Sequence, residues 1–147
     1  MSNTIILKNY LNIFEEFTAE AAITPGNLIE LIADGKVQKH AGADGFAMPM
    51  FANVDALQGK GKDDAYAAGD KVQVWIPQRG DQVNAILANG ETAVIGSKLV
   101  SAGDGTLKVY DVVSGTEEII VAIALKAVDM SGSSAVDPDG RVPVVIV

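Results

Sequence analysis

The sequence predicts a small all-β domain, a barrel or sandwich of short strands, and three observations support this. Residues 72–76 read Val-Gln-Val-Trp-Ile, and this alternation is typical of a strand with one buried face. Glycine-containing turns separate short segments of β-forming residues through residues 77–110. Apolar residues make up 48% of the 147 residues but aromatic residues only 5%, so Val, Ile, Leu and Ala build most of the core.

Residues 1–22 are expected to form an N-terminal arm that precedes a β domain spanning residues 23–147. Apolar residues at positions 7, 10, 11 and 14 have the spacing of one helix face, so a short amphipathic helix is one interpretation. An extended arm is the other, and we favour it because a terminal segment has few neighbours of its own to hold it. The apolar side chains of an extended arm then need a partner surface.

Turn residues place the first strands of the domain. Pro25-Gly26 predicts a turn, because proline sets φ at the first central position and glycine tolerates a positive φ after it. Asp34-Gly35 separates residues 28–33 from residues 36–40 and predicts a β-hairpin. A short strand around residues 48–54 and a polar loop over residues 58–65 are expected to follow, and a loop of this length often carries function.

The second half of the chain is expected to continue as short strands between turns. Residues 119–128 form a near-continuous apolar run that fits a helix or a central strand, and its β-branched start favours the strand. Residues 142–147 predict a final strand at a sheet edge, because Pro143 lacks the N–H that a central strand donates. The other strands expected in this half span residues 83–87, 92–95, 98–100 and 106–110.

The charge of the chain argues against nucleic acid as a partner. There are 11 Lys and Arg residues against 19 Asp and Glu residues, a net charge of −8, and the lysines are scattered. A nucleic-acid binder needs a basic stripe that displaces counterions from the phosphates. An acidic exterior instead keeps a densely arrayed protein soluble.

The absence of cysteine excludes disulfides, thiolate nucleophiles and zinc sites made of cysteine. A short apolar run near the N-terminus falls far below the length of a signal-peptide core or a membrane span. We therefore expect no membrane partner and synthesis in the cytoplasm.

Motifs that could carry chemistry are each better explained as turns or solvated loops. His40 is the only histidine, and no Gly-x-Ser-x-Gly elbow surrounds any serine, so a hydrolytic triad is not predicted. Residues 59–62, Gly-Lys-Gly-Lys, lack the spacing of a phosphate loop. Residues 79–81, Arg-Gly-Asp, and residues 137–140, Asp-Pro-Asp-Gly, are typical of tight turns, and the latter lacks the further ligands of a calcium loop. We predict no enzyme activity, no cofactor and no metal.

Large apolar residues point instead to contacts with other proteins. Residues 46–51 gather Phe and Met side chains, which we interpret as core or subunit interface, and methionine adapts to irregular contacts. Trp75 points away from the side of Val72, so another part of the chain covers it or it anchors an interface. The residues predicted to form the protein interface are Ile5, Ile6, Leu7, Tyr10, Phe14, Phe17, Met48, Met50, Phe51, Lys60, Lys62, Tyr66 and Trp75.

Several turns occur in an order that resembles one family. The stretches are Tyr66-Ala-Ala-Gly-Asp-Lys-Val72, Arg79-Gly-Asp-Gln-Val83, Leu87-Ala-Asn-Gly-Glu-Thr92, Gly96-Ser-Lys-Leu99 and Ser101-Ala-Gly-Asp-Gly105, with Ile23-Thr-Pro-Gly26, Phe51-Ala-Asn53 and residues 122–129. Together they resemble the β core of tailed-phage capsid cement, or head decoration, proteins. The resemblance covers roughly two thirds of the chain and weakens at both ends.

The resemblance implies a β-barrel or β-tulip domain that forms trimers on the outside of an icosahedral phage head. It implies binding at three-fold and quasi-three-fold positions, contact with the major capsid protein, and stabilisation of the expanded shell against internal DNA pressure. Two alternatives stay open. One is a lipoyl- or biotinyl-type carrier domain, suggested by Lys98 near a turn, and the other is a barrel-type accessory module of an enzyme.

Overall fold

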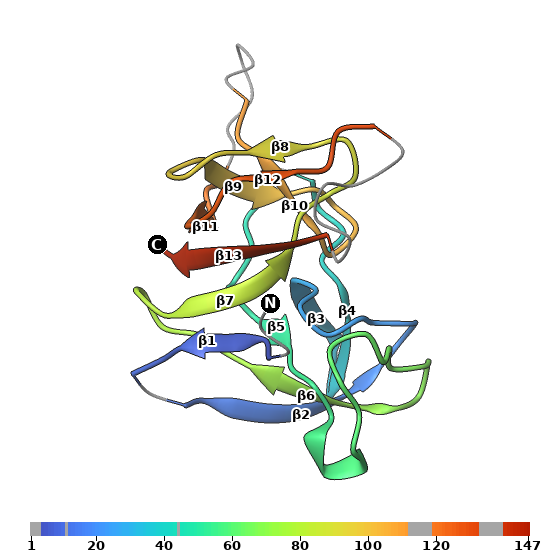
Figure 1. Cartoon of the computed structure of the whole chain (residues 1–147). Coiled ribbons are helices and arrows are strands. Elements are labelled where there is room, and N and C mark those ends of the chain that lie inside the picture. The colour runs from blue at the N-terminus through green and yellow to red at the C-terminus, as the bar shows by residue number, and fades with distance from the viewer. Residues whose placement is uncertain (1–3, 11, 44, 112–118, 133–139) are drawn as a thin grey trace.

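The computed structural model describes residues 4–10, 12–43, 45–111, 119–132 and 140–147, and these confirm the all-β class (Figure 1). The first sheet has six strands, in the order β1 (Ile6–Lys8), β7 (Gln82–Ile86), β13 (Arg141–Ile146), β11 (Ala122–Ala124), β9 (Lys98–Ser101) and β10 (Leu107–Val109). The second has five, in the order β3 (Ile29–Ala33), β4 (Lys36–Lys39), β2 (Phe14–Ala19), β6 (Lys71–Trp75) and β5 (Phe51–Ala52). A two-stranded sheet pairs β12 (Val128–Asp129) with β8 (Thr92–Ala93), and a 3-10 helix spans Ala56–Gln58.

The sheets do not close into a barrel, which was one of the forms expected. In the five-stranded sheet the two edges meet at one end only, where the Ile29 amide donates to the Met50 carbonyl at 2.9 Å. The Gly26 amide donates to the Ala52 carbonyl at 2.8 Å beside it. Beyond this contact β3 is not paired with β5, so the five-stranded sheet curls without closing.

The N-terminal segment is extended, as predicted in preference to a helix, and its strands belong to both large sheets. β1 pairs with β7 at the edge of the six-stranded sheet. β2 lies inside the five-stranded sheet, antiparallel to β6 and parallel to β4. The partner surface that its apolar side chains require is therefore supplied in large part by the chain itself.

Two predicted turns are confirmed by backbone geometry. Asp34-Gly35 joins β3 to β4, and Gly35 has a φ of 72°, which a residue with a side chain rarely adopts. Gly26 has a φ of 95° after Pro25, and the turn leads into β3 as expected. The strand expected over residues 48–54 is shorter than predicted, because only Phe51–Ala52 pairs with β6.

β6 has a buried apolar side chain on each of its faces and joins the two halves of the core. Val72 and Val74 are fully buried in a cluster with Val37 inside the curled five-stranded sheet. Trp75 points the other way and is fully buried in a second cluster. This cluster includes residues on the inner face of the six-stranded sheet, such as Leu99. Of the two interpretations of Trp75, coverage by another part of the chain is therefore correct.

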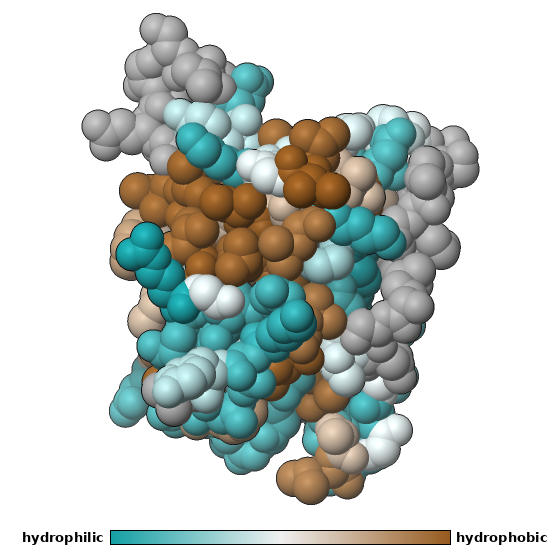
Figure 2. All heavy atoms as spheres, turned by 60° about the vertical axis from the view of Figure 1, so that its left-hand side comes forward, coloured by the Kyte–Doolittle hydropathy of each residue, from teal (hydrophilic) through white to brown (hydrophobic). Residues whose placement is uncertain are grey.

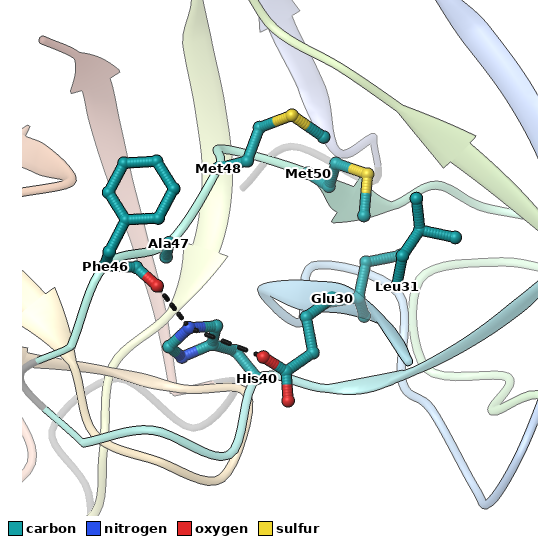
Figure 3. Close-up of a pocket in the computed structure, with 8 residues that line it drawn as sticks. Glu30, Leu31, His40, Phe46, Ala47, Met48 and Met50 are labelled. Carbon is teal, nitrogen blue, oxygen red and sulfur yellow. Dashed lines mark hydrogen bonds and ion pairs between the residues drawn. The ribbon is translucent and has the colours of Figure 1, made fainter. Parts of the chain in front are cut away.

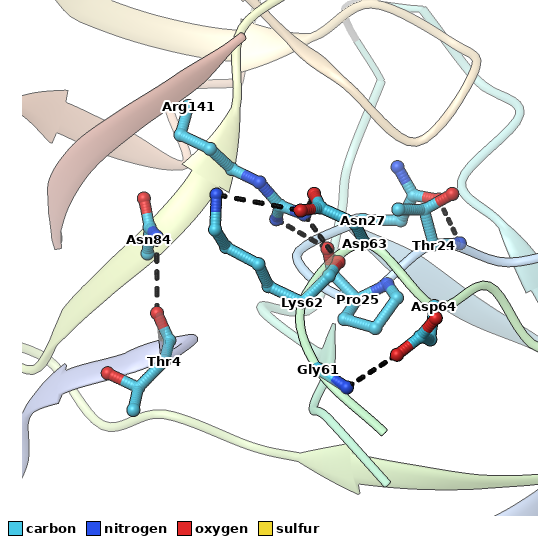
Figure 4. A network of polar contacts seen from close by, with 10 residues as sticks. All are labelled: Thr4, Thr24, Pro25, Asn27, Gly61, Lys62, Asp63, Asp64, Asn84 and Arg141. Carbon is cyan, nitrogen blue, oxygen red and sulfur yellow. Dashed lines mark hydrogen bonds and ion pairs between the residues drawn. The ribbon is translucent and has the colours of Figure 1, made fainter. Parts of the chain in front are cut away.

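Arg141 ties the six-stranded sheet to loops of the five-stranded half (Figure 4). Its side chain is 3% exposed, and its guanidinium donates to the carbonyl oxygens of Pro25 and Lys62, the latter at 2.7 Å. Asp63 lies 3.8 Å away and supplies the opposite charge. A buried guanidinium is stable only with such partners, so this contact fixes the turn at Pro25 and the loop at Lys62 against β13.

The last strand is central, and the prediction of an edge position is wrong. β13 lies between β7 and β11. In an antiparallel ladder the N–H and C=O of one residue face the same neighbour, and the Pro143 carbonyl accepts from the Leu125 amide at 2.8 Å. The missing N–H of Pro143 therefore faces Leu125, just past the end of β11, where the ladder needs no donor.

The apolar run 119–128 holds a central strand, as favoured, but a much shorter one than expected. β11 covers only Ala122–Ala124, between β9 and β13. Residues 125–127 are exposed and lead to β12, which pairs with β8 in the two-stranded sheet.

Trp75→Ala is expected to lower the free energy of unfolding by about 3–5 kcal/mol, because it leaves a large cavity between the sheets. Trp75→Phe should cost less, because the indole N–H that it removes has no hydrogen-bond partner among the described residues. Urea denaturation measures both. Leu57→Ala is the control, since Leu57 is 90% exposed and its loss should change stability by less than about 0.5 kcal/mol. Wild-type stability of Trp75→Ala would contradict this account of the core.

Gly26→Ala is expected to destabilise the protein far more than Gly35→Ala, although both glycines have positive φ. A Cβ at Gly26 would lie 2.1 Å from Arg141 Nη1, whereas a Cβ at Gly35 would meet nothing within 4 Å. Gly35→Ala therefore carries only backbone strain of roughly 1–2 kcal/mol, and Gly26→Ala adds displacement of a buried charge worth about 3–5 kcal/mol. Equal unfolding midpoints of the two variants would rule out the Arg141 clamp as the cause.

Candidate interaction surfaces

The structure places the residues predicted for the interface in two different environments. Inside the chain lie Ile5, Met50, Phe51, Lys62, Tyr66 and Trp75, each 7% exposed or less. At the surface lie Tyr10, Phe14, Met48 and Lys60, and half-buried are Ile6, Leu7 and Phe17. The first group serves the core or the Arg141 contact, and only the others are accessible to a partner.

The exposed members of that set lie apart from one another. Tyr10 is in the connection between β1 and β2, next to Asp81, whose side chain accepts from the Tyr10 amide at 3.1 Å. Phe14 begins β2 and lines a shallow pocket with Val54 and Leu57 of the 3-10 helix region. Met48 lies in the segment before β5. They mark three separate places and not one continuous surface.

A pocket of about 230 Å³ opens beside β3, between that strand and residues 46–50 (Figure 3). Its lining is mostly apolar and includes Leu31, Phe46 and Met48, all of them exposed. His40 and Glu30 supply the polar part, with His40 Nε2 3.7 Å from the Glu30 carboxylate.

His40 is held as a structural residue by its two ring nitrogens. Nε2 is 3.0 Å from the Phe46 carbonyl, which can only accept, so Nε2 carries the proton. In the neutral ring Nδ1 then accepts from the Ser101 hydroxyl, which lies 2.6 Å away. Ser101 is 0% exposed and its oxygen also accepts from the Gly103 amide at 3.2 Å, so the hydroxyl is enclosed and out of reach of a substrate.

The Arg-Gly-Asp tripeptide forms the turn between β6 and β7, as predicted. Asp81 is 3% exposed, and its carboxylate accepts from the backbone amides of Gln78 and Tyr10. A carboxylate that is buried and engaged in this way holds the turn and is not displayed to a receptor.

An exposed apolar surface lies outside the set of predicted residues. On the outer face of the six-stranded sheet, Ile123 of β11 pairs with Val145 of β13, and the neighbouring Leu125 and Val147 are exposed. The turn after β8 lies beside the end of β11, because the Gly96 amide donates to the Ala124 carbonyl. This turn adds Val94 and Ile95, which are 59% and 74% exposed. We call Val94, Ile95, Ile123, Leu125, Val145 and Val147 the apolar face.

Figure 2 brings forward the side on which the C-terminus lies, and apolar atoms cover much of its upper half while hydrophilic atoms dominate below. A contiguous exposed apolar area of this kind marks an interaction site more often than scattered apolar residues do. The sequence predicts a strand over residues 92–95 that includes Val94 and Ile95, whereas β8 ends at Ala93 and leaves both residues in an exposed turn.

Within the described residues, no group of three or more His, Cys, Asp or Glu side chains is arranged to hold a metal ion. The same part of the chain has no helix with the length and apolar character needed to cross a membrane.

No protein-family model matches this chain, and no curated protein matches its sequence. Among solved structures it is similar to the crystal structure of the head fiber gp8.5 N base in bacteriophage phi29, with a TM-score of 0.59. The similarity covers 93% of this chain and 95% of that chain, at 16% sequence identity. At this identity the comparison establishes a shared fold over nearly the whole length of both chains.

Tyr66 provides a pH test of the interior of the five-stranded half. Burial raises its pKa to about 12; the Gln73 amide, which donates to the phenol oxygen, opposes this, and the nearby Asp55 charge adds to it. The unfolded chain loses this proton near pH 10 and the folded protein near 12, so the free energy of unfolding should fall as pH rises from 10 through about 12.

Urea denaturation of wild type and Tyr66→Phe across this pH range measures the effect. The wild type should lose more stability than the variant, since the variant has no phenol to ionise at this position. Parallel pH profiles for the two proteins would show that the phenol is not protected by burial.

Proposed function

We propose that this chain is a structural protein of a tailed-phage head that cements the shell. It binds the outside of the expanded icosahedral head at three-fold and quasi-three-fold positions, as a homotrimer in contact with the major capsid protein. Its role is to hold neighbouring capsid subunits together against the pressure of packaged DNA. It carries no catalytic activity and binds no nucleic acid.

The shared fold with a head fiber base of bacteriophage phi29 is the observation that carries this proposal. The similarity spans nearly all of both chains, so it is a likeness of the whole architecture and not of one common motif. The ordered turns over residues 66–105, which resemble head decoration proteins, support the same location independently of the structure.

The energetics of cementing fit a small domain with modest individual contacts. A trimer that engages several capsid subunits gains avidity of about 10²-fold or more over one contact. Binding only to the expanded lattice also stabilises that state by mass action, by about 2.7 kcal/mol per site at a hundredfold excess over Kd.

A second candidate function is the attachment base of a head fibre. The observation that favours it is the description of the similar phi29 chain as the N base of a head fiber. In that case the chain anchors a projecting part to the head and need not strengthen the shell. A carrier function gains no such support, because Lys98 is the first residue of β9 and not the tip of a turn.

The purified protein is expected to co-sediment with expanded empty heads of the phage that encodes it and not with unexpanded heads. Expansion rearranges the capsid subunits, so a clamp for one lattice should not fit the other. Quantitative gel analysis of the pellets measures the number of copies per head. Absence of the protein from every pellet of expanded heads would refute a head-bound role.

Heating the same heads separates the two candidates. A cement protein should raise the temperature at which DNA-filled heads release their DNA, because release requires subunits that it bridges to separate. An attachment base should bind without changing this temperature. Heads saturated with bovine serum albumin are the control.

A further inference from the structure

The outer face of the six-stranded sheet combines an apolar centre with cations at its two sides. One row of cross-strand neighbours runs Lys8, Gln82, Val145, Ile123 and Lys98, from β1 through β7, β13 and β11 to β9. The side chains of directly opposite residues point to the same side of a sheet. With strands about 4.8 Å apart, the two lysines flank the apolar centre at a separation of roughly 19 Å.

The strands of this sheet contain no acidic residue, although the whole chain has a net charge of −8. The five-stranded sheet differs, since β2 carries Glu15 and Glu16 and β3 carries Glu30. Lys8 and Lys98 are both exposed, and Arg79 and Lys126 are exposed in turns that adjoin the ends of β13 and β11. Exposed cations therefore lie around the apolar face and the strands there carry no carboxylate, whereas the five-stranded sheet carries lysines (Lys36, Lys39 and Lys71) together with its carboxylates.

A second copy of the same face is a poor occupant. Two such faces related by a two-fold axis would place lysines of one copy among lysines of the other, and like charges at an interface are destabilising. A partner with an apolar centre and carboxylates at its margin would instead match both features. The exposed apolar side chains provide the area to be buried, and the lysines select and orient the partner.

We propose that the apolar face, flanked by Lys8 and Lys98, is the surface that docks on the phage head, against a protein surface with an apolar centre and an acidic margin. This inference rests on the proposed function for the location of the partner. It assigns the contact to the six-stranded sheet and leaves the five-stranded half, with its carboxylates, facing away from the shell.

Binding titrations against expanded heads test the assignment with two independent variants. Ile95→Glu places a charge in the apolar face at a turn where the side chain is 74% exposed, so folding should be unaffected. Lys8→Glu with Lys98→Glu reverses the two flanking charges. Each should weaken binding about tenfold or more, as loss of a central interface contact does. Wild-type binding should also weaken as salt is raised.

Matched controls lie on the other half of the molecule. Leu57→Glu places the same charge on an apolar side chain that is 90% exposed, and Lys36→Glu with Lys60→Glu makes the same change in net charge. Both should bind within about twofold of wild type. Thermal melts of all variants check that each is folded.

The outcomes separate this inference from the proposed function. If wild type binds and the face variants bind equally well, the apolar face is the wrong surface and the head-bound role stands. If light scattering shows that Ile95→Glu dissociates an oligomer of the free protein, a second copy covers the face and the inference is overturned. If wild type binds no expanded head, both fall together.

Discussion

The fold depends on the packing of Trp75 between the two large sheets of the molecule. β6 presents Val72 and Val74 to the interior of the curled five-stranded sheet and Trp75 to the six-stranded sheet, so a single strand serves both cores. The buried Arg141 contact then fixes the loops of one half against a strand of the other. Trp75 packs against the inner face of the six-stranded sheet, and the Arg141 contact lies at the first residue of β13, so the outer face around Ile123 and Val145 remains available for other interactions.

Local chemistry was sufficient to predict several of the strands, but the bounds of others and the arrangement of all of them depend on distant partners. The Asp34-Gly35 hairpin and the β6 alternation follow from backbone preferences of a few residues, and both were predicted. The central position of β13 was not, because the rule that excludes proline from central strands assumes that the neighbouring strand continues past it. Here β11 ends at Ala124, so the residue opposite Pro143 is Leu125, outside the strand, and no ladder hydrogen bond of β11 requires the missing N–H.

The apolar face was missed for a related reason. Its members come from β11, β13 and the turn after β8, which are far apart in sequence and become neighbours only through the strand order. Residues 46–51 are contiguous and apolar in the sequence, yet Met50 and Phe51 serve the core. Apolar residues that are contiguous in the sequence therefore indicated core packing, whereas the exposed apolar face can be found only when the arrangement of the strands is known. The role proposed for it joins a shared architecture with an apolar face whose strands carry lysines and no carboxylate.

A density map of expanded phage heads saturated with the protein tests the central claim most directly. We expect density for the chain on the outer surface at three-fold and quasi-three-fold positions, with β11 and β13 toward the shell and the 3-10 helix at Ala56–Gln58 away from it. Density with the five-stranded sheet against the shell would contradict the assigned docking face. Heads with no added density would contradict the head-bound role itself.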